Sequence, residues 1–115
     1  IHSDAYAAGE LKHGPIALIE NGVPVIATMT DEKLVKKSIS NLQEVITRGA
    51  KAIVVTNQDL KEYNFENVIQ IPRVNKLLSP VISVIPMQLF AYYVAKYKNI
   101  DVDKPRNLAK SVTVE

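Results

Sequence analysis

The chain has 115 residues, and its 14 lysine and arginine residues against 12 acidic ones give a net charge of +2. This length is typical of one small domain, and so small a charge, spread along the chain, provides no electrostatic footprint for nucleic acid. The chain contains no cysteine, which excludes disulfides and thiolate metal sites. No apolar run reaches the roughly 18 residues of a membrane span, and the start carries no signal pattern. We therefore expect a cytoplasmic protein that binds neither nucleic acid nor membranes.

Two short helices are predicted near the start of the chain. The first is capped by Ser3 or Asp4 and ends at Gly9. After a turn at residues 13–14, the second begins at Pro15, because proline suits the first position of a helix.

Two buried β-strands are predicted on either side of a long helix. Residues 23–29 and residues 51–56 are apolar runs bounded by polar or turn residues. Between them, apolar residues recur at helical spacing from a cap at Thr30 or Asp31 to a stop at Gly49. The order strand, helix, strand favours a right-handed parallel crossover.

A third strand and a second long helix are predicted in the rest of the chain. The strand covers residues 67–71, and the helix begins with a cap at Ser79 and runs to Tyr97. Pro86 falls inside it, so we expect a kink there or two helices that meet. Residues 101–115 form an irregular tail. Three parallel strands with helices constitute an incomplete doubly wound α/β sheet of the flavodoxin-like kind.

Three clusters of polar residues have an explanation that requires no ligand. The lysines within residues 33–37 could bind phosphate, but we strongly favour a solvated helix face. Residues 57–59 follow the carboxyl end of the second strand, where open parallel sheets hold ligands, yet we favour a simple turn. His2 and Asp4 could share a metal ion, but two ligands without a third do not make a metal site.

One stretch concentrates titratable groups in a turn. Residues 9–15 read Gly-Glu-Leu-Lys-His-Gly-Pro, with Glu10 close to His13. On the pattern alone, His13 is either an ordinary surface histidine or a proton-transferring group. Lys110, near the other end of the chain, is on spacing alone an exposed lysine.

This stretch and the terminus together carry a resemblance. Residues 105–115 read Pro-Arg-Asn-Leu-Ala-Lys-Ser-Val-Thr-Val-Glu, and with residues 9–15 they closely resemble the carboxy-terminal end of the glucosamine-6-phosphate synthase family. Its members convert fructose 6-phosphate and glutamine into glucosamine 6-phosphate and glutamate. The resemblance implies the sugar isomerase (SIS) fold, a three-layer arrangement with helices on both faces of a five-stranded parallel sheet. Residues 1–115 would be the carboxy-terminal portion of the second SIS subdomain.

The resemblance also implies roles for individual residues. His13 would open the sugar ring, reaching the site of the neighbouring subunit in a homodimer. Lys110 would form an imine with the open-chain sugar, and Ala109 beside it would contact the substrate. Apart from the resemblance, we expect Glu10 to support the turn by holding backbone amides. Neither a metal nor an organic cofactor is implied.

Other parts of the family's site would lie before Ile1: the phosphate-binding loop, the proton-transferring carboxylate and the glutaminase domain. Because the chain begins at Ile1 rather than methionine, we expect a piece of a longer protein that is inactive alone. Two alternatives remain open. One is a phosphosugar-binding SIS module without turnover, and the other is a relative among the amino-sugar deglycases.

Overall fold

The structure is a computed structural model that describes residues 1–106. The chain forms two compact units, Ile1–Ser83 and Val84–Glu115. The first unit holds the sheet, the first long helix and several short helices, and the second holds most of the last helix. All residues of the sheet and of its carboxyl edge therefore belong to one unit.

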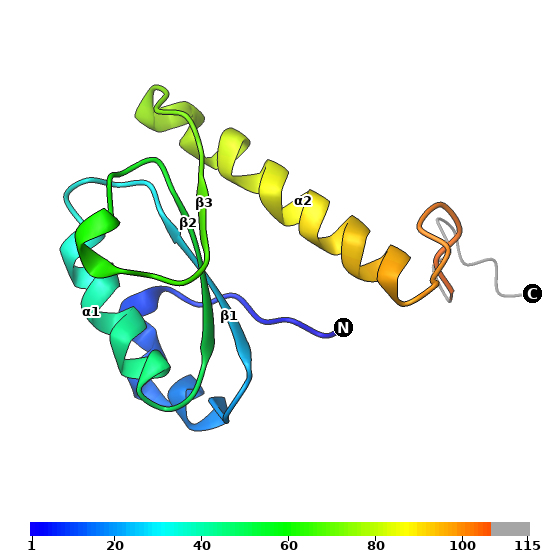
Figure 1. Cartoon of the computed structure of the whole chain (residues 1–115), viewed down its shortest axis with the longest axis horizontal. Coiled ribbons are helices and arrows are strands. Elements are labelled where there is room, and N and C mark those ends of the chain that lie inside the picture. The colour runs from blue at the N-terminus through cyan, green and yellow to red at the C-terminus, as the bar shows by residue number, and fades with distance from the viewer. Residues whose placement is uncertain (107–115) are drawn as a thin grey trace, which may run out of the picture. The chain divides into compact units, whose positions relative to one another are not determined.

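A three-stranded parallel sheet forms the centre of the first unit (Figure 1). In spatial order, its strands are β1 (Pro24–Met29), β2 (Lys51–Thr56) and β3 (Val68–Gln70). Both pairings are parallel, with Met29 opposite Thr56 and Thr56 opposite Gln70. The carboxyl ends of all three strands therefore meet at one edge, and the predicted parallel α/β architecture is confirmed.

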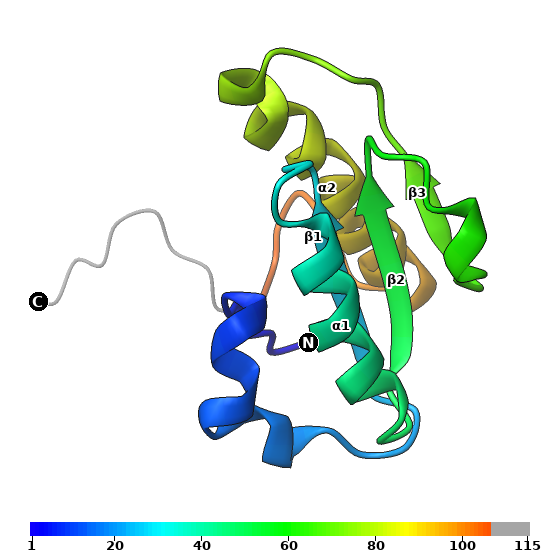
Figure 2. The same cartoon turned by 90° about the vertical axis from the view of Figure 1, so that its left-hand side faces the viewer.

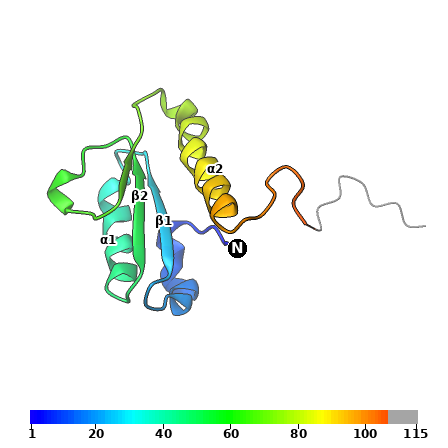
Figure 3. The same cartoon turned by 45° about the vertical axis from the view of Figure 1, so that its right-hand side comes forward.

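Apolar burial on both faces of β2 explains why the sheet forms around this strand. Val54 and Val55 point to opposite faces and are both fully buried. Helix α1 (Val35–Ile46) covers one face (Figure 2 and Figure 3). Its buried side chains recur at helical spacing and join Val54 in the core: Val35, Ile39, Leu42 and Val45. Burial of each such side chain contributes roughly 1.5–3 kcal/mol, so this layer holds the unit together.

Helix α1 begins later than the sequence predicts. The expected cap, Asp31, opens a separate turn in which the N–H of Leu34 donates to the Asp31 carbonyl oxygen at 2.9 Å. The Asp31 carboxylate accepts the N–H of Lys33 at 3.1 Å, as a capping side chain does. The regular helix nevertheless starts only at Val35. Asp31 is thereby left close to the end of β1.

The helix predicted from Ser3 or Asp4 to Gly9 is wrong at both ends. Two short 3-10 helices are found instead, η1 (Ala8–His13) and η2 (Pro15–Leu18), and η1 packs on α1. Gly9 lies inside η1, and the break comes at Gly14, whose φ of +146° favours glycine. The predicted helix start at Pro15 is confirmed.

Helix α2 (Ser79–Tyr97) is continuous through Pro86, so the alternative of two separate helices is wrong. The capping side chain is that of Asn75 and not that of the buried Ser79. Asn75 accepts the N–H of Leu77 at 3.0 Å at the start of the short helix η4 (Lys76–Leu78), which directly precedes α2.

Within the described residues, one segment is long and apolar enough to cross a membrane when judged by length and composition, Lys76–Tyr97. A core helix of a soluble protein passes the same test, because it too is apolar on all sides. The prediction that no apolar run is long enough for a membrane span is wrong for this segment. The expectation that the protein does not bind membranes stays a prediction.

A glycine after α1 provides a test of close packing in the first unit. Gly49 has a φ of +97°, and a Cβ added there would lie 2.9 Å from the Asn21 Cα. We expect Gly49→Ala to lower the free energy of unfolding by about 1–3 kcal/mol, because backbone atoms of residue 21 would have to move. Gly22→Ala is the matched control, since Gly22 has a similar φ of +87° and a Cβ there meets nothing within 4 Å. Equal effects of the two changes in chemical denaturation would contradict this packing.

Candidate functional site

The predicted turn around His13 is anchored by apolar neighbours on both sides. His13 is the last residue of η1, and η2 begins directly after Gly14. Leu11 and Ile16 are partly buried against the core under α1, whereas the His13 side chain is exposed. The turn is therefore anchored by apolar contacts before and after His13. Its imidazole lies at the surface, where another molecule can reach it.

A polar hollow of about 620 Å³ lies at the carboxyl edge of the sheet. Its lining comes from the segments that follow β1, β2 and β3, and only Val74 among the lining residues is apolar. Open parallel sheets hold ligands at this edge because loops from several strands converge there. The hollow is therefore the second candidate site of the first unit, after the turn at His13.

Thr56 joins the ends of β1 and β2 at this edge. Its side chain is fully buried, and its hydroxyl donates to the Met29 carbonyl oxygen at 2.7 Å while accepting the N–H of Gln58 at 3.0 Å. The Gln58 side-chain amide in turn donates to Asn57 Oδ1 at 2.6 Å. These bonds make residues 57–59 the turn that the sequence favours.

Arg73 follows β3, the strand next to β2, and its side chain reaches the turn at residues 57–59. Its Nε donates to the Asn57 carbonyl oxygen and its Nη2 donates to Gln58 Oε1, both at 3.1 Å. The sequence analysis did not single out Arg73. The available signal was its place two residues after the buried Ile71, at the carboxyl end of a predicted strand.

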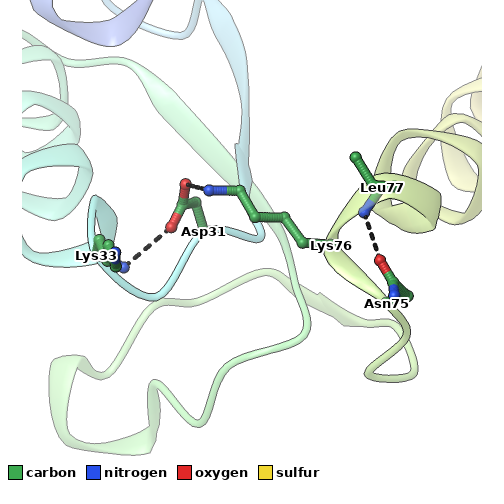
Figure 4. Close-up of polar contacts among 5 residues, drawn as sticks. All are labelled: Asp31, Lys33, Asn75, Lys76 and Leu77. Atoms are coloured by element: carbon green, nitrogen blue, oxygen red, sulfur yellow. Dashed lines mark hydrogen bonds and ion pairs between the residues drawn. The ribbon is translucent and has the colours of Figure 1, made fainter.

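Asp31 and Lys76 form an ion pair at the same edge (Figure 4). Lys76 Nζ lies 2.7 Å from Asp31 Oδ2, and the Lys33 N–H donates to Asp31 Oδ1. The hydrogen bond from Lys76 and then that from the Lys33 backbone hold the pKa of Asp31 below its ordinary value of 3.8. Sequence reasoning treated Asp31 only as a helix cap and missed Lys76, because nothing local indicates that the two residues meet.

A protein-family model described as SIS domain matches residues 1–96 of the chain. The chain belongs to the SIS domain family. The expected SIS fold is thus confirmed, and the sheet edge described above is the carboxyl edge of an SIS domain.

This SIS chain is similar over its whole length to curated proteins named glutamine-fructose-6-phosphate aminotransferase (isomerizing). Identity is 61% with the protein of Clostridium perfringens, over 119 aligned residues that cover 100% of this chain and 20% of that protein. It is 58% with the protein of Clostridium tetani, covering 100% of this chain and 19% of that protein. The SIS chain therefore spans about a fifth of the length of these relatives.

A solved structure agrees with the sequence relatives. It is the carboxy-terminal domain of glucosamine-fructose-6-phosphate aminotransferase from Francisella tularensis, with a TM-score of 0.83 and 42% identity. The match covers 90% of the SIS chain and 30% of that chain. The resemblance predicted from the two end motifs is confirmed.

Two of the predicted site residues, Lys110 and Ala109, lie outside the described residues. The structure therefore does not describe where Lys110 lies relative to His13, and the roles of all three stay predictions. Glu10 is exposed, and no side-chain hydrogen bond from it to another of residues 1–106 is found. Its supporting role also stays a prediction, because the anchors that are visible are the apolar neighbours of the turn.

The described residues 1–106 contain no group of three or more His, Asp and Glu residues that could hold a metal ion. His2 Nδ1 lies 3.7 Å from Asp4 Oδ2, and both side chains are largely exposed.

The lowered pKa of Asp31 predicts how stability depends on pH. The stability that this carboxylate contributes is present above about pH 3.8 and is lost as pH falls through the lower pKa of the folded state. We expect Asp31→Asn to be less stable than the unchanged protein near neutral pH, with a difference that disappears in strong acid. Urea denaturation across this range measures it.

Asp59→Asn is the matched control, because Asp59 likewise accepts a backbone N–H, that of Lys61 at 3.2 Å, but has no ion pair among the described residues. A difference between Asp31→Asn and the unchanged protein that is the same at every pH would contradict this account of the ion pair.

Proposed function

We propose that this chain is the carboxy-terminal portion of the second SIS subdomain of a glutamine-dependent fructose-6-phosphate aminotransferase that also isomerises its product. The whole protein would make glucosamine 6-phosphate for hexosamine synthesis in the cytoplasm. The observation that carries the proposal is identity of 50–61% over the full chain with curated proteins of that name. The complete motifs at residues 9–15 and 105–115 support it.

His13 is proposed to act in ring opening. Cyclic fructose 6-phosphate opens when its C2–O5 bond breaks, which requires loss of a proton from the anomeric hydroxyl and gain of one at the ring oxygen. An imidazole suits both transfers, since its ordinary pKa lies near neutrality. The exposed position of His13 on an anchored turn supports action on a sugar bound mainly by another subunit, as in a homodimer.

Lys110 is proposed to activate the ketone. Its neutral amine attacks C2 of the open-chain sugar, and loss of water gives an imine. Ammonia released from glutamine then replaces the lysine nitrogen on C2, and the amine returns to the enzyme. Ala109 would contact the sugar beside this bond, and Glu10 would support the turn that carries His13.

The rest of the site would come from other parts of the protein. Domains upstream of Ile1 would supply the phosphate cradle, the carboxylate that moves a proton between adjacent carbons, and the ammonia. Within residues 1–106, two of the cations at the carboxyl edge are bound to protein oxygens, Arg73 to that of Asn57 and Lys76 to that of Asp31. This supports a phosphate cradle elsewhere.

Trapping of the imine tests the lysine. Full-length gene product treated with fructose 6-phosphate and borohydride is expected to gain one reduced sugar adduct at Lys110, located by peptide mass mapping. Lys110→Arg removes the adduct, since a guanidinium does not form the imine, and Lys104→Arg in the same tail keeps it. Sugar phosphate that binds without leaving any adduct would favour the binding-module alternative.

Subunit mixing tests the position of His13. His13→Ala and Lys110→Arg should each lower kcat at least about 100-fold in homodimers. Co-expressed in equal amounts, they should recover about a quarter of full activity, because half of the dimers are hybrids with one intact site of two. Hybrids purified with two different affinity tags and found inactive would place His13 in the site of its own subunit.

A further inference from the structure

The chain changes direction at Gly14, directly after His13. Gly14 has a φ of +146° and a ψ of −55°, which lie outside the regions that residues with a Cβ adopt. A Cβ added at this position would meet nothing within 4 Å. Glycine is therefore required here by the backbone conformation and not by close packing.

Pro15 adds a second restriction to the same turn. The proline ring fixes its own φ at about −65° and disfavours the helical region for the residue before it. A residue with a side chain at position 14 would therefore adopt extended backbone, with a negative φ and a positive ψ. Both angles would then have the opposite sign from those of Gly14, so the chain would leave His13 in another direction.

The chain on each side of this turn is held by apolar contacts. Leu11 before His13 and Ile16 after Gly14 are partly buried against the core of the first unit. Helix η1 packs on α1 (Figure 2), and the Ala17 N–H donates to the Gly14 carbonyl oxygen at 2.9 Å. These neighbours cannot take up a change of the backbone at position 14 without losing burial.

His13 itself is the part of the turn that is free to move. Its side chain and Gly14 are exposed between the two anchors, and Pro15 cannot rotate about its fixed φ. We infer that Gly14 is a positioning residue for His13, because its conformation sets the direction in which the imidazole leaves the surface. A side chain at position 14 displaces the imidazole and leaves the unit folded. The inference rests on the proposed function, in which His13 opens the sugar ring.

Gly14→Ala tests this role in the full-length gene product. We expect kcat to fall at least about tenfold, because a displacement of about 1 Å of a reacting group lowers rates up to roughly a hundredfold. KM for fructose 6-phosphate should change little, since other groups of the proposed site bind the sugar. Gly14→Asn should be equally impaired, because asparagine tolerates a φ of about +60° and not that of Gly14.

A double variant shows whether Gly14 acts through His13. In a His13→Ala background, Gly14→Ala should lower kcat no further, because the group that it displaces is already removed. A merely structural role of Gly14 would instead lower kcat by the same factor in both backgrounds.

Two other glycines provide matched controls. Gly22 has a φ of +87° and also leaves open space for a Cβ, so Gly22→Ala strains the backbone outside the turn that carries His13. Gly9 lies in η1 and has no positive φ, so Gly9→Ala alters the same short helix without that strain. Hydrogen exchange should speed up within residues 11–17 in Gly14→Ala and in neither control. Thermal stability should fall about as much in Gly14→Ala as in Gly22→Ala.

The outcomes separate this inference from the proposed function. An unchanged full-length protein without aminotransferase activity overturns the proposed function, and full kcat in His13→Ala overturns the role of His13. Either result removes the positioning role as well. If both stand, a Gly14→Ala variant that keeps the kcat of Gly22→Ala overturns the positioning role alone. An equal loss with and without His13 does the same, as does a Gly14→Ala variant that fails to fold while Gly22→Ala folds.

Discussion

Parallel pairing of β2 on both of its sides is the constraint on which the rest of the structure depends. Val54 and Val55 are fully buried on opposite faces, so the strand is stable only between two neighbours and beneath a helix. Parallel pairing then requires every connection to return to the same end of the sheet. Helix α1 makes that return between β1 and β2, and its buried face supplies four of the eight buried residues of the core.

The same constraint gathers the polar chemistry at one edge. Because the three strands point the same way, the residues that follow them converge there, although they are far apart in the sequence. Asp31 follows β1 and pairs with Lys76, and Asn57 follows β2 and accepts a hydrogen bond from Arg73, so the segment after β3 contacts both of the other loops. Buried backbone oxygens at the end of β2 need donors, and the segment after β3 supplies two: the Ile71 N–H donates to the Thr56 oxygen and Arg73 donates to the Asn57 oxygen.

Catalytic groups of the proposed reaction are distributed rather than concentrated in this chain. His13 is presented on a turn anchored under α1, whereas Lys110 belongs to the tail. Under that proposal, the other groups of the site would come from parts of the protein outside this chain, which spans about a fifth of its relatives' length.

The sequence by itself determined the strands, the parallel crossover and the family. Apolar runs such as residues 51–56 and motifs such as residues 9–15 are local patterns, which can be recognised in the sequence without a structure. The ends of helices were harder to predict. Gly9 could have ended a helix and Ser79 could have capped one, but the break lies at Gly14 and the capping side chain is Asn75. Only the tertiary structure decided that Asp31 meets Lys76 and that Arg73 meets Asn57. The physical reason is that these contacts arise from the direction of the strands and the path of the segment between β3 and α2, which no spacing along the chain encodes.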